Sequence, residues 1–181
     1  MGTHGRRIER YFLGSTTERF LRKLSVPLLT TRQVTRSGVQ PIRHIMVTTD
    51  FGEGSSSAID YGCSLATKHE AKMTLLHVLN DVQADVAGIY RKHLLQGIEV
   101  ELESLLPAEA RNKCAVRVLI GRPIRRILWM VDSERIDLIV MNIHKKTAME
   151  RLSIGSTAEK IIRAANVPVL AVPSSARASN A

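Results

Sequence analysis

Short apolar runs alternate with amphipathic segments from residue 42 to residue 173. The runs are rich in β-branched residues and span residues 42–49, 73–79, 115–120, 138–141 and 167–172. Between the runs, apolar residues recur three and four positions apart, which is the period of an amphipathic helix. One such segment carries Ile124, Ile127, Leu128 and Val131. The pattern therefore predicts five strands alternating with four helices.

Nearly continuous apolar strands are typical of a sheet that is buried on both faces. Right-handed helical crossovers between parallel strands produce such a sheet, because they place helices over each face. We therefore predict a doubly wound α/β fold, with a five-stranded parallel sheet and helices on both faces. Sheets of this kind bind ligands beyond the carboxyl ends of their strands, so function is expected at that edge.

The first residues of the chain repeat its last ones. An offset of 141 aligns residues 9–31 with 150–172, and ten of these 23 positions are identical, whereas average residue usage would give about one or two. We therefore predict that residues 1–31 are the loop, helix and strand of a preceding copy of the domain. Residues 32–41 are then the linker, 42–173 the complete domain, and 174–181 a flexible tail.

Several motifs, in this order, resemble the universal stress protein (UspA-like) family. They are Val-Thr-Thr-Asp50, Leu-Leu-His-Val78, Gly121-Arg-Pro123, Asp137-Leu-Ile-Val-Met141, Gly155-Ser-Thr-Ala-Glu159 and Val167-Pro-Val-Leu170. The resemblance covers residues 42–173, and the remnant at 1–31 is similar to the C-terminal quarter of the same family. It implies an adenine nucleotide alpha hydrolase-like fold and dimers formed through the last strand.

The resemblance also implies a phosphate-binding loop after the fourth strand. In one subclass of the family a Gly-x2-Gly-x9-Gly-(Ser/Thr) loop binds ATP, because glycines let backbone amides approach phosphates and a helix N-terminus favours an anion. Here the three glycine positions are Asn142, Lys145 and Gly155, followed by Ser156 and Thr157. Two glycines are therefore replaced, although the two side chains that replace them are polar and one is cationic.

The base of a bound nucleotide is expected, from the same resemblance, at the ends of three strands. Asp50 matches an aspartate that faces the adenine or ribose, and the backbone at Val78 and Met141 matches positions that line the base pocket. Thr49, which precedes Asp50, is included in the candidate site. The structural alternative is that Asp50 shapes a turn after its strand and that Ser156 caps the last helix.

Three functions remain open at this point. The first is a non-catalytic, stress-associated regulatory protein that binds ATP or AMP, with magnesium in the case of ATP. The second is a dimerisation scaffold with a degenerate site and no cofactor, and the third is an enzyme that hydrolyses ATP slowly. No Ser/His/Asp set and no paired Cys/His spacing is present, so we assign no catalytic residue and no metal ligand.

Composition and charge bear on location and partners. Apolar residues make up 44% and charged residues 24% of the chain, and no apolar run approaches the ~18 residues of a membrane span. We therefore expect a cytoplasmic globular protein in which Cys63 and Cys114 are buried free thiols. The net charge is +9, of which residues 1–40 contribute +6. With 4% aromatics and Trp129 expected in the core, nucleic acid is not an expected partner.

The repeat predicts a strand pairing. Val26-Pro27 matches Val167-Pro168, and in the family that the chain resembles this strand lies against its counterpart in a second domain. We therefore expect the strand at 26–31 to dock on the strand at 167–172 within one molecule. If the strand at 26–31 is absent, the strand at 167–172 is expected to form a homodimer.

Overall fold

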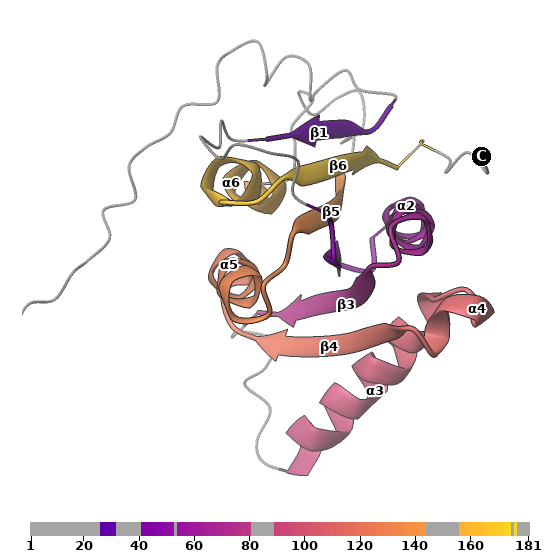
Figure 1. The fold of residues 1–181 in the computed structure, drawn as a ribbon. Helices are drawn as coiled ribbons and strands as arrows, with labels where there is room; N and C mark the ends of the chain where they lie inside the picture. Colours follow the sequence, from indigo (N-terminus) through magenta and orange to yellow (C-terminus); the bar gives the residue numbers. More distant parts are fainter. Residues whose placement is uncertain are drawn as a thin grey trace, which may run out of the picture.

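The computed structural model describes residues 26–31, 41–52, 54–80, 89–143, 156–174 and 176. The strands are β1 (Leu28–Thr30), β2 (His44–Thr49), β3 (Lys72–Leu79), β4 (Cys114–Ile120), β5 (Leu138–Ile143) and β6 (Val169–Pro173). The helices are α2 (Ser55–Lys68), α3 (Ile89–Leu105), α4 (Ala108–Arg111), α5 (Pro123–Ser133) and α6 (Ser156–Ala164). The strands form one sheet in the order β1-β6-β5-β2-β3-β4 (Figure 1).

The sheet has six strands rather than the predicted five. Five of them, β2 to β6, are the predicted parallel strands, and each crossover between them passes through a helix. The sixth is β1, which pairs antiparallel with β6, with Leu29 opposite Leu170. The prediction of a doubly wound α/β fold is confirmed. The predicted number of strands was one too few because it covered residues 42–173, and β1 precedes this range.

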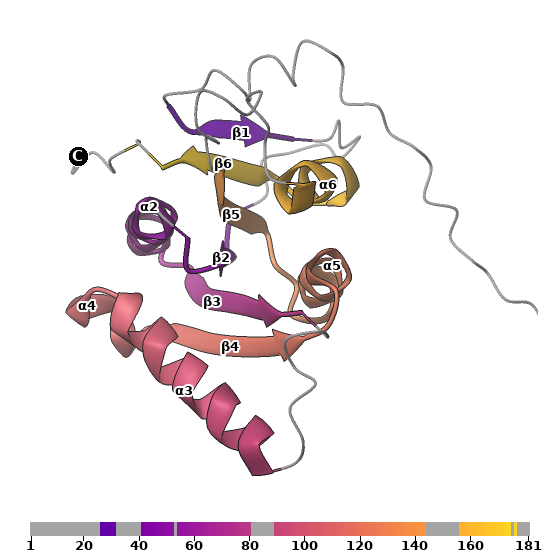
Figure 2. The ribbon, with the colours of Figure 1, turned by 180° about the vertical axis from the view of Figure 1, so that it is seen from behind.

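Two hydrophobic cores lie on opposite faces of the sheet, because successive strand residues point to opposite sides. Ile45 and Val47 of β2 pack under α2 and α3, whereas Met46 packs under α5 and α6, and none of the three is exposed. Figure 2 shows the same division, with α5 and α6 on one side of the sheet and α2, α3 and α4 on the other. Both faces are thus covered, as predicted.

The helices follow the predicted apolar spacing. Gly62 lets α2 approach the sheet closely, since a Cβ there would lie 2.3 Å from a Val47 methyl. Two features differ from the prediction. The short helix α4 was not expected. Trp129, expected in the core, is 54% exposed on α5, whose buried residues are Ile127, Met130 and Val131. Among the described residues, no helix is long and apolar enough to cross a membrane.

Candidate functional site

The candidate nucleotide-binding residues lie where the strand order reverses. The chain leaves β2 through α2 to reach β3 on one side, while β5 lies on the other side of β2. Thr48 of β2 is opposite Met141 of β5, so Asp50 and Asn142 follow just beyond at the carboxyl edge. The structure therefore brings the predicted residues of β2 and β5 together at the expected edge of the sheet.

The remaining predicted residues lie on β3, at the start of α6, or outside the described part of the chain. Val78, half-buried, lies near the end of β3 and packs against the core under α5 and α6. Ser156 and Thr157 open α6, with Ser156 exposed and Thr157 half-buried. Lys145 and Gly155 lie outside the described residues.

Asp50 shapes the turn that follows β2. Its Oδ1 accepts a hydrogen bond of 3.0 Å from the amide of Gly52, and Oγ1 of Thr49 accepts one of 3.0 Å from the amide of Phe51. Phe51 has a φ of 61°, an unusual value that these two bonds support. Asp50 is nevertheless exposed. Stabilising the turn and contacting a ligand are therefore compatible roles for its side chain.

Phe51 and His77 form the wall of this edge on the α2 side, and the sequence analysis missed both. Their ring centroids lie 4.7 Å apart at an interplanar angle of 53°. Nδ1 of His77 is 2.9 Å from the carbonyl oxygen of Thr49, so the tautomer that carries a proton on Nδ1 makes this hydrogen bond. The only feature of the sequence that could have indicated these two residues is that Phe51 directly follows Asp50.

Asn142, at the first glycine position of the family loop, is held on the α2 side of the sheet. Its neighbours Met141 and Ile143 pack in the core under α5 and α6, so the alternation of the strand directs Asn142 to the opposite face. There its Oδ1 accepts a hydrogen bond of 3.2 Å from Oγ of Ser174. The carbonyl oxygen of Ser174 accepts a bond of 3.4 Å from Oγ of Ser57 in α2.

The segment after β6 packs against the start of α2. A Cβ at Gly54, the N-cap of α2, would lie 2.4 Å from Cβ of Ser174. Ala176 is buried in the core under α2 and α3, and its amide donates to the carbonyl oxygen of Pro173 at 2.9 Å. Ser174 and Ala176, assigned to the tail on sequence grounds, are therefore part of the packed domain.

The first turn of α6 carries an acidic residue whose charge is compensated. Oε1 of Glu159 accepts a hydrogen bond of 2.5 Å from Nη2 of Arg163, one turn further along. An unpaired carboxylate here would oppose an anion at the N-terminus of α6, and the arginine reduces that repulsion. The helix start at Ser156 and Thr157 thus remains electrostatically suited to a phosphate.

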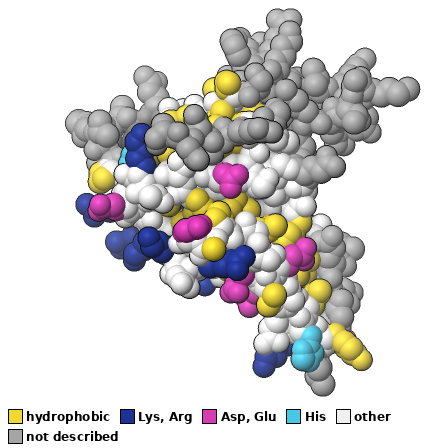
Figure 3. Space-filling view, turned by 90° about the vertical axis from the view of Figure 1, so that its right-hand side faces the viewer, with side chains coloured by type: hydrophobic (Ala, Val, Ile, Leu, Met, Phe, Trp, Pro, Cys, Tyr) yellow, Lys and Arg dark blue, Asp and Glu magenta, His cyan; other side chains and the backbone are white. Residues whose placement is uncertain are grey.

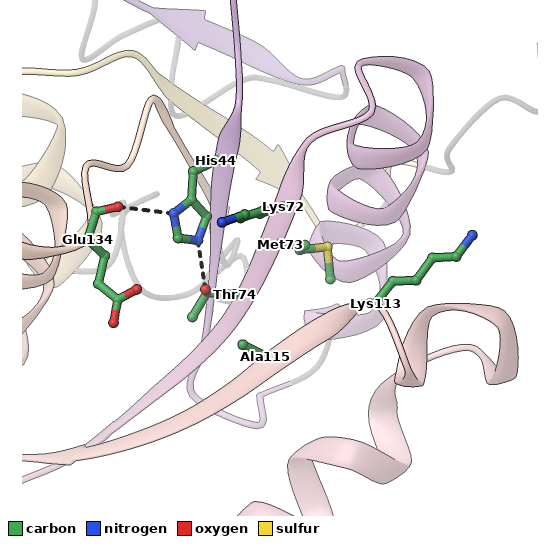
Figure 4. Close-up of a pocket in the computed structure, with 7 residues that line it drawn as sticks. All are labelled: His44, Lys72, Met73, Thr74, Lys113, Ala115 and Glu134. Atoms are coloured by element: carbon green, nitrogen blue, oxygen red, sulfur yellow. Dashed lines mark hydrogen bonds between the residues drawn. The ribbon is translucent and has the colours of Figure 1, made fainter.

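A pocket of about 300 Å³ lies at the opposite, amino edge of the sheet (Figure 4). It is lined by His44, Lys72, Met73, Thr74, Lys113, Ala115 and Glu134. Nδ1 of His44 is 3.1 Å from the carbonyl oxygen of Glu134, and Nε2 is 2.9 Å from Oγ1 of Thr74. Both ring nitrogens are therefore engaged in joining β2 to α5 and β3, and the side chain of Lys113 points away from the histidine in the figure.

The two cysteines are half-buried free thiols. Burial raises the pKa of Cys63 to about 11 and that of Cys114 to about 12. Both thiols are protonated at neutral pH and are weak nucleophiles and metal ligands in that form. Among the described residues, no group of three His, Cys, Asp or Glu side chains could hold a metal ion.

These features define a doubly wound α/β protein with polar groups gathered at the switch point of its sheet. The profile of the universal stress protein family matches residues 41–173, which is 133 of the 181 residues. The chain belongs to the universal stress protein family.

Individual relatives agree with this assignment. A universal stress protein of Methanocaldococcus jannaschii is 28% identical over 154 residues, covering 72% of this chain and 94% of its own. A crystal structure of a universal stress protein from Archaeoglobus fulgidus superposes with a TM-score of 0.68 at 22% identity. That match covers 92% of this chain but 57% of the other, so it extends beyond residues 41–173.

Two further solved structures of the family contain nucleotides. A universal stress protein in complex with cAMP superposes with a TM-score of 0.55 at 21% identity, covering 74% of this chain and 98% of the other. A universal stress protein from Archaeoglobus fulgidus in complex with dAMP superposes with a TM-score of 0.54 at 16% identity, covering 74% of this chain and 99% of the other. At these identities the likeness concerns the fold.

Proposed function

We propose that this chain is a cytoplasmic, non-catalytic regulatory protein of the stress response that binds an adenine nucleotide of the AMP type. The base and ribose lie at the carboxyl edge against Asp50, Val78 and Met141, and the phosphate lies at the start of α6. Family membership supports the regulatory role, and the cAMP and dAMP complexes of the structural neighbours support the ligand class. The two free cysteines are typical of a reducing compartment.

The hydrogen bond between Ser174 and Asn142 is the observation that carries this proposal. Asn142 replaces a loop glycine, and a side chain directed into the phosphate site would block it. The bond instead holds Asn142 on the α2 face, whereas α6 starts from the other face of the sheet. The Asn142 side chain is therefore directed away from the start of α6, which supports a phosphate at Ser156.

A monophosphate fits this arrangement better than a triphosphate. A triphosphate needs several close backbone approaches along the loop, and two of the three glycines that would permit them are replaced. A single phosphate needs only the amides and hydroxyls at the start of α6. We therefore expect AMP to bind more tightly than ATP, and magnesium to have little effect on AMP.

Calorimetric titration of the full chain with AMP and with ATP, each with and without magnesium, tests the proposal. Asp50→Asn keeps an oxygen that can accept the amide of Gly52 and removes the charge, so a weaker affinity with unchanged folding would place Asp50 at the ligand. Glu99→Gln, on exposed α3, is the matched control for the lost charge. If Asp50→Asn binds as tightly as the parent, the base pocket lies elsewhere.

Asn142→Gly tests the position of the phosphate separately. Because the Asn142 side chain lies on the α2 face, restoring the family glycine is expected to leave AMP affinity within about twofold, a free-energy difference of about 0.4 kcal/mol. A tenfold or larger gain would show that Asn142 obstructs the nucleotide in solution.

A dimerisation scaffold without a small ligand is the second candidate, and the replacement of two of the three loop glycines favours it. In this case neither AMP nor ATP would release heat in the titration. Hydrolysis is examined in the same samples by release of phosphate from ATP. Sustained release that tracks the protein concentration would overturn the non-catalytic assignment.

A further inference from the structure

Helix α5 presents a solvent-exposed face made of three arginines and one tryptophan. Arg122 immediately precedes the helix, and Arg125 and Arg126 lie four and three residues before Trp129, which is the spacing of neighbours on a helix surface. All four residues are exposed. We call them the Arg-Trp face. Figure 1 shows α5 next to α6 on one face of the sheet, with no described element over the side of α5 that faces away from the sheet.

One arginine of this face is held in place by the backbone. Nε of Arg126 donates a hydrogen bond of 2.7 Å to the carbonyl oxygen of Ile120. The side chain lies directly over Gly121, where a Cβ would be 2.7 Å from that same Nε, so only glycine permits this position. The Arg126 guanidinium is therefore preorganised at a position one turn before Trp129, which lowers the entropy lost when it binds an anion.

The charge of the Arg-Trp face is of one sign. The first turn of α5 contains no acidic residue, and its N-terminus adds the positive end of the helix dipole. The nearest acid on the helix is Asp132, whose Oδ1 accepts a hydrogen bond of 3.2 Å from Nδ2 of Asn166. In contrast, the side of the molecule in Figure 3 shows basic and acidic side chains interspersed.

We propose that the Arg-Trp face binds single-stranded nucleic acid. An exposed indole is a platform on which a base stacks, and arginines one turn away neutralise the phosphates on either side of that base. An acidic peptide would use the arginines but offers no planar group for the indole, so nucleic acid accounts for both components. A buried Trp129, as expected from the sequence, would leave the chain without a stacking platform. The exposure of Trp129 in the structure supplies one.

The chain has one tryptophan, so its fluorescence reports directly on this face. Titration of the full chain with an unlabelled oligothymidylate of about ten nucleotides is expected to quench that fluorescence. The logarithm of the affinity should fall with the logarithm of salt concentration with a slope of about −2, since each of three neutralised phosphates contributes about −0.7.

Variants separate this site from general attraction to a basic protein. Arg122→Ala, Arg125→Ala and Arg126→Ala should each weaken binding and make the salt slope shallower by about 0.7. Trp129→Ala, followed by anisotropy of a labelled oligonucleotide, should weaken binding with an unchanged slope. Lys68→Ala and Lys92→Ala remove the same charge from exposed positions of α2 and α3 and should leave binding unchanged.

Three results would overturn the proposal. The first is the absence of quenching at low salt, and the second is an equal loss of affinity in the arginine variants and the lysine controls. The third is quenching by an oligoglutamate peptide at the same concentrations as the oligonucleotide, which would assign the face to an acidic protein partner. Far-ultraviolet circular dichroism of each variant verifies that the overall helix content is unchanged, so that a loss of binding reports on the surface.

Discussion

Leu29 of β1 lies directly opposite Leu170 of β6, which is its own counterpart in the repeat of 141 residues. The neighbouring pairs exchange places: Leu28 is opposite Ala171, and Thr30 is opposite Val169. Equivalent residues are thus related by an approximate two-fold axis through the Leu29–Leu170 pair. This is the arrangement that two copies of one strand adopt in a symmetric dimer, formed here within one chain.

Removal of β1 should change the oligomeric state. We expect the full chain to be a monomer, because β1 occupies the outer edge of β6. Deletion of residues 1–40 removes β1 and exposes that edge, so a homodimer paired through β6 is expected. Deletion of residues 1–25 retains β1 and is the matched control, which should be monomeric. Size-exclusion chromatography with light scattering measures all three.

The prediction fails if the full chain is already a dimer and remains one after deletion of residues 1–40. That result would show that β1 does not occupy the edge in solution. Dimers in both truncated chains would instead assign the association to residues 1–25.

Gly54 and Gly97 should respond in opposite directions to the same substitution. Gly54 has a φ of 86°, and Gly54→Ala places a Cβ 2.4 Å from Cβ of Ser174. Because of this strain and this clash, the free energy of unfolding should fall by about 2 kcal/mol or more. Gly97 lies inside α3 with no atom within 4 Å of a Cβ, so Gly97→Ala should raise it by about 0.5–1 kcal/mol. Urea unfolding of both variants measures the difference.

A double-mutant cycle should reveal the coupling between Ser174 and Asn142. Each alanine variant loses the hydrogen bond of 3.2 Å, so the second substitution should cost less when the first is present. The expected coupling is about 1 kcal/mol in the free energy of unfolding. Additive effects of the two substitutions would mean that the bond does not hold Asn142, which would also weaken the case for a phosphate at α6.

The strands and the main helices could be predicted from sequence because their apolar spacing is set by the two cores. The exposure of Trp129 could have been predicted as well. It follows Ile127 by two positions, about 200° around the helix, which places the two on opposite sides of α5.

The contacts that shape the candidate site could not be predicted in the same way. Ser174 meets Asn142 across 32 residues of chain, and no spacing in the sequence relates them. The contact of Phe51 with His77 depends on the positive φ of Phe51, an unusual conformation for a residue with a side chain. Tertiary contacts between distant segments of this kind carry no periodic signal.

The stability of the protein should fall at alkaline pH because of its thiols. Burial holds the pKa of Cys114 at about 12 in the folded chain, above its ordinary value of 9.0. Above about pH 9 the unfolded chain therefore loses a proton that the folded chain retains, and the free energy of unfolding decreases until the folded thiol also ionises. Cys63, with a pKa of about 11, acts in the same direction over a narrower range. Urea unfolding at several pH values between about 8 and 11 should show a steeper decline for the parent chain than for Cys114→Ala, whereas parallel declines would show that Cys114 titrates alike in both states.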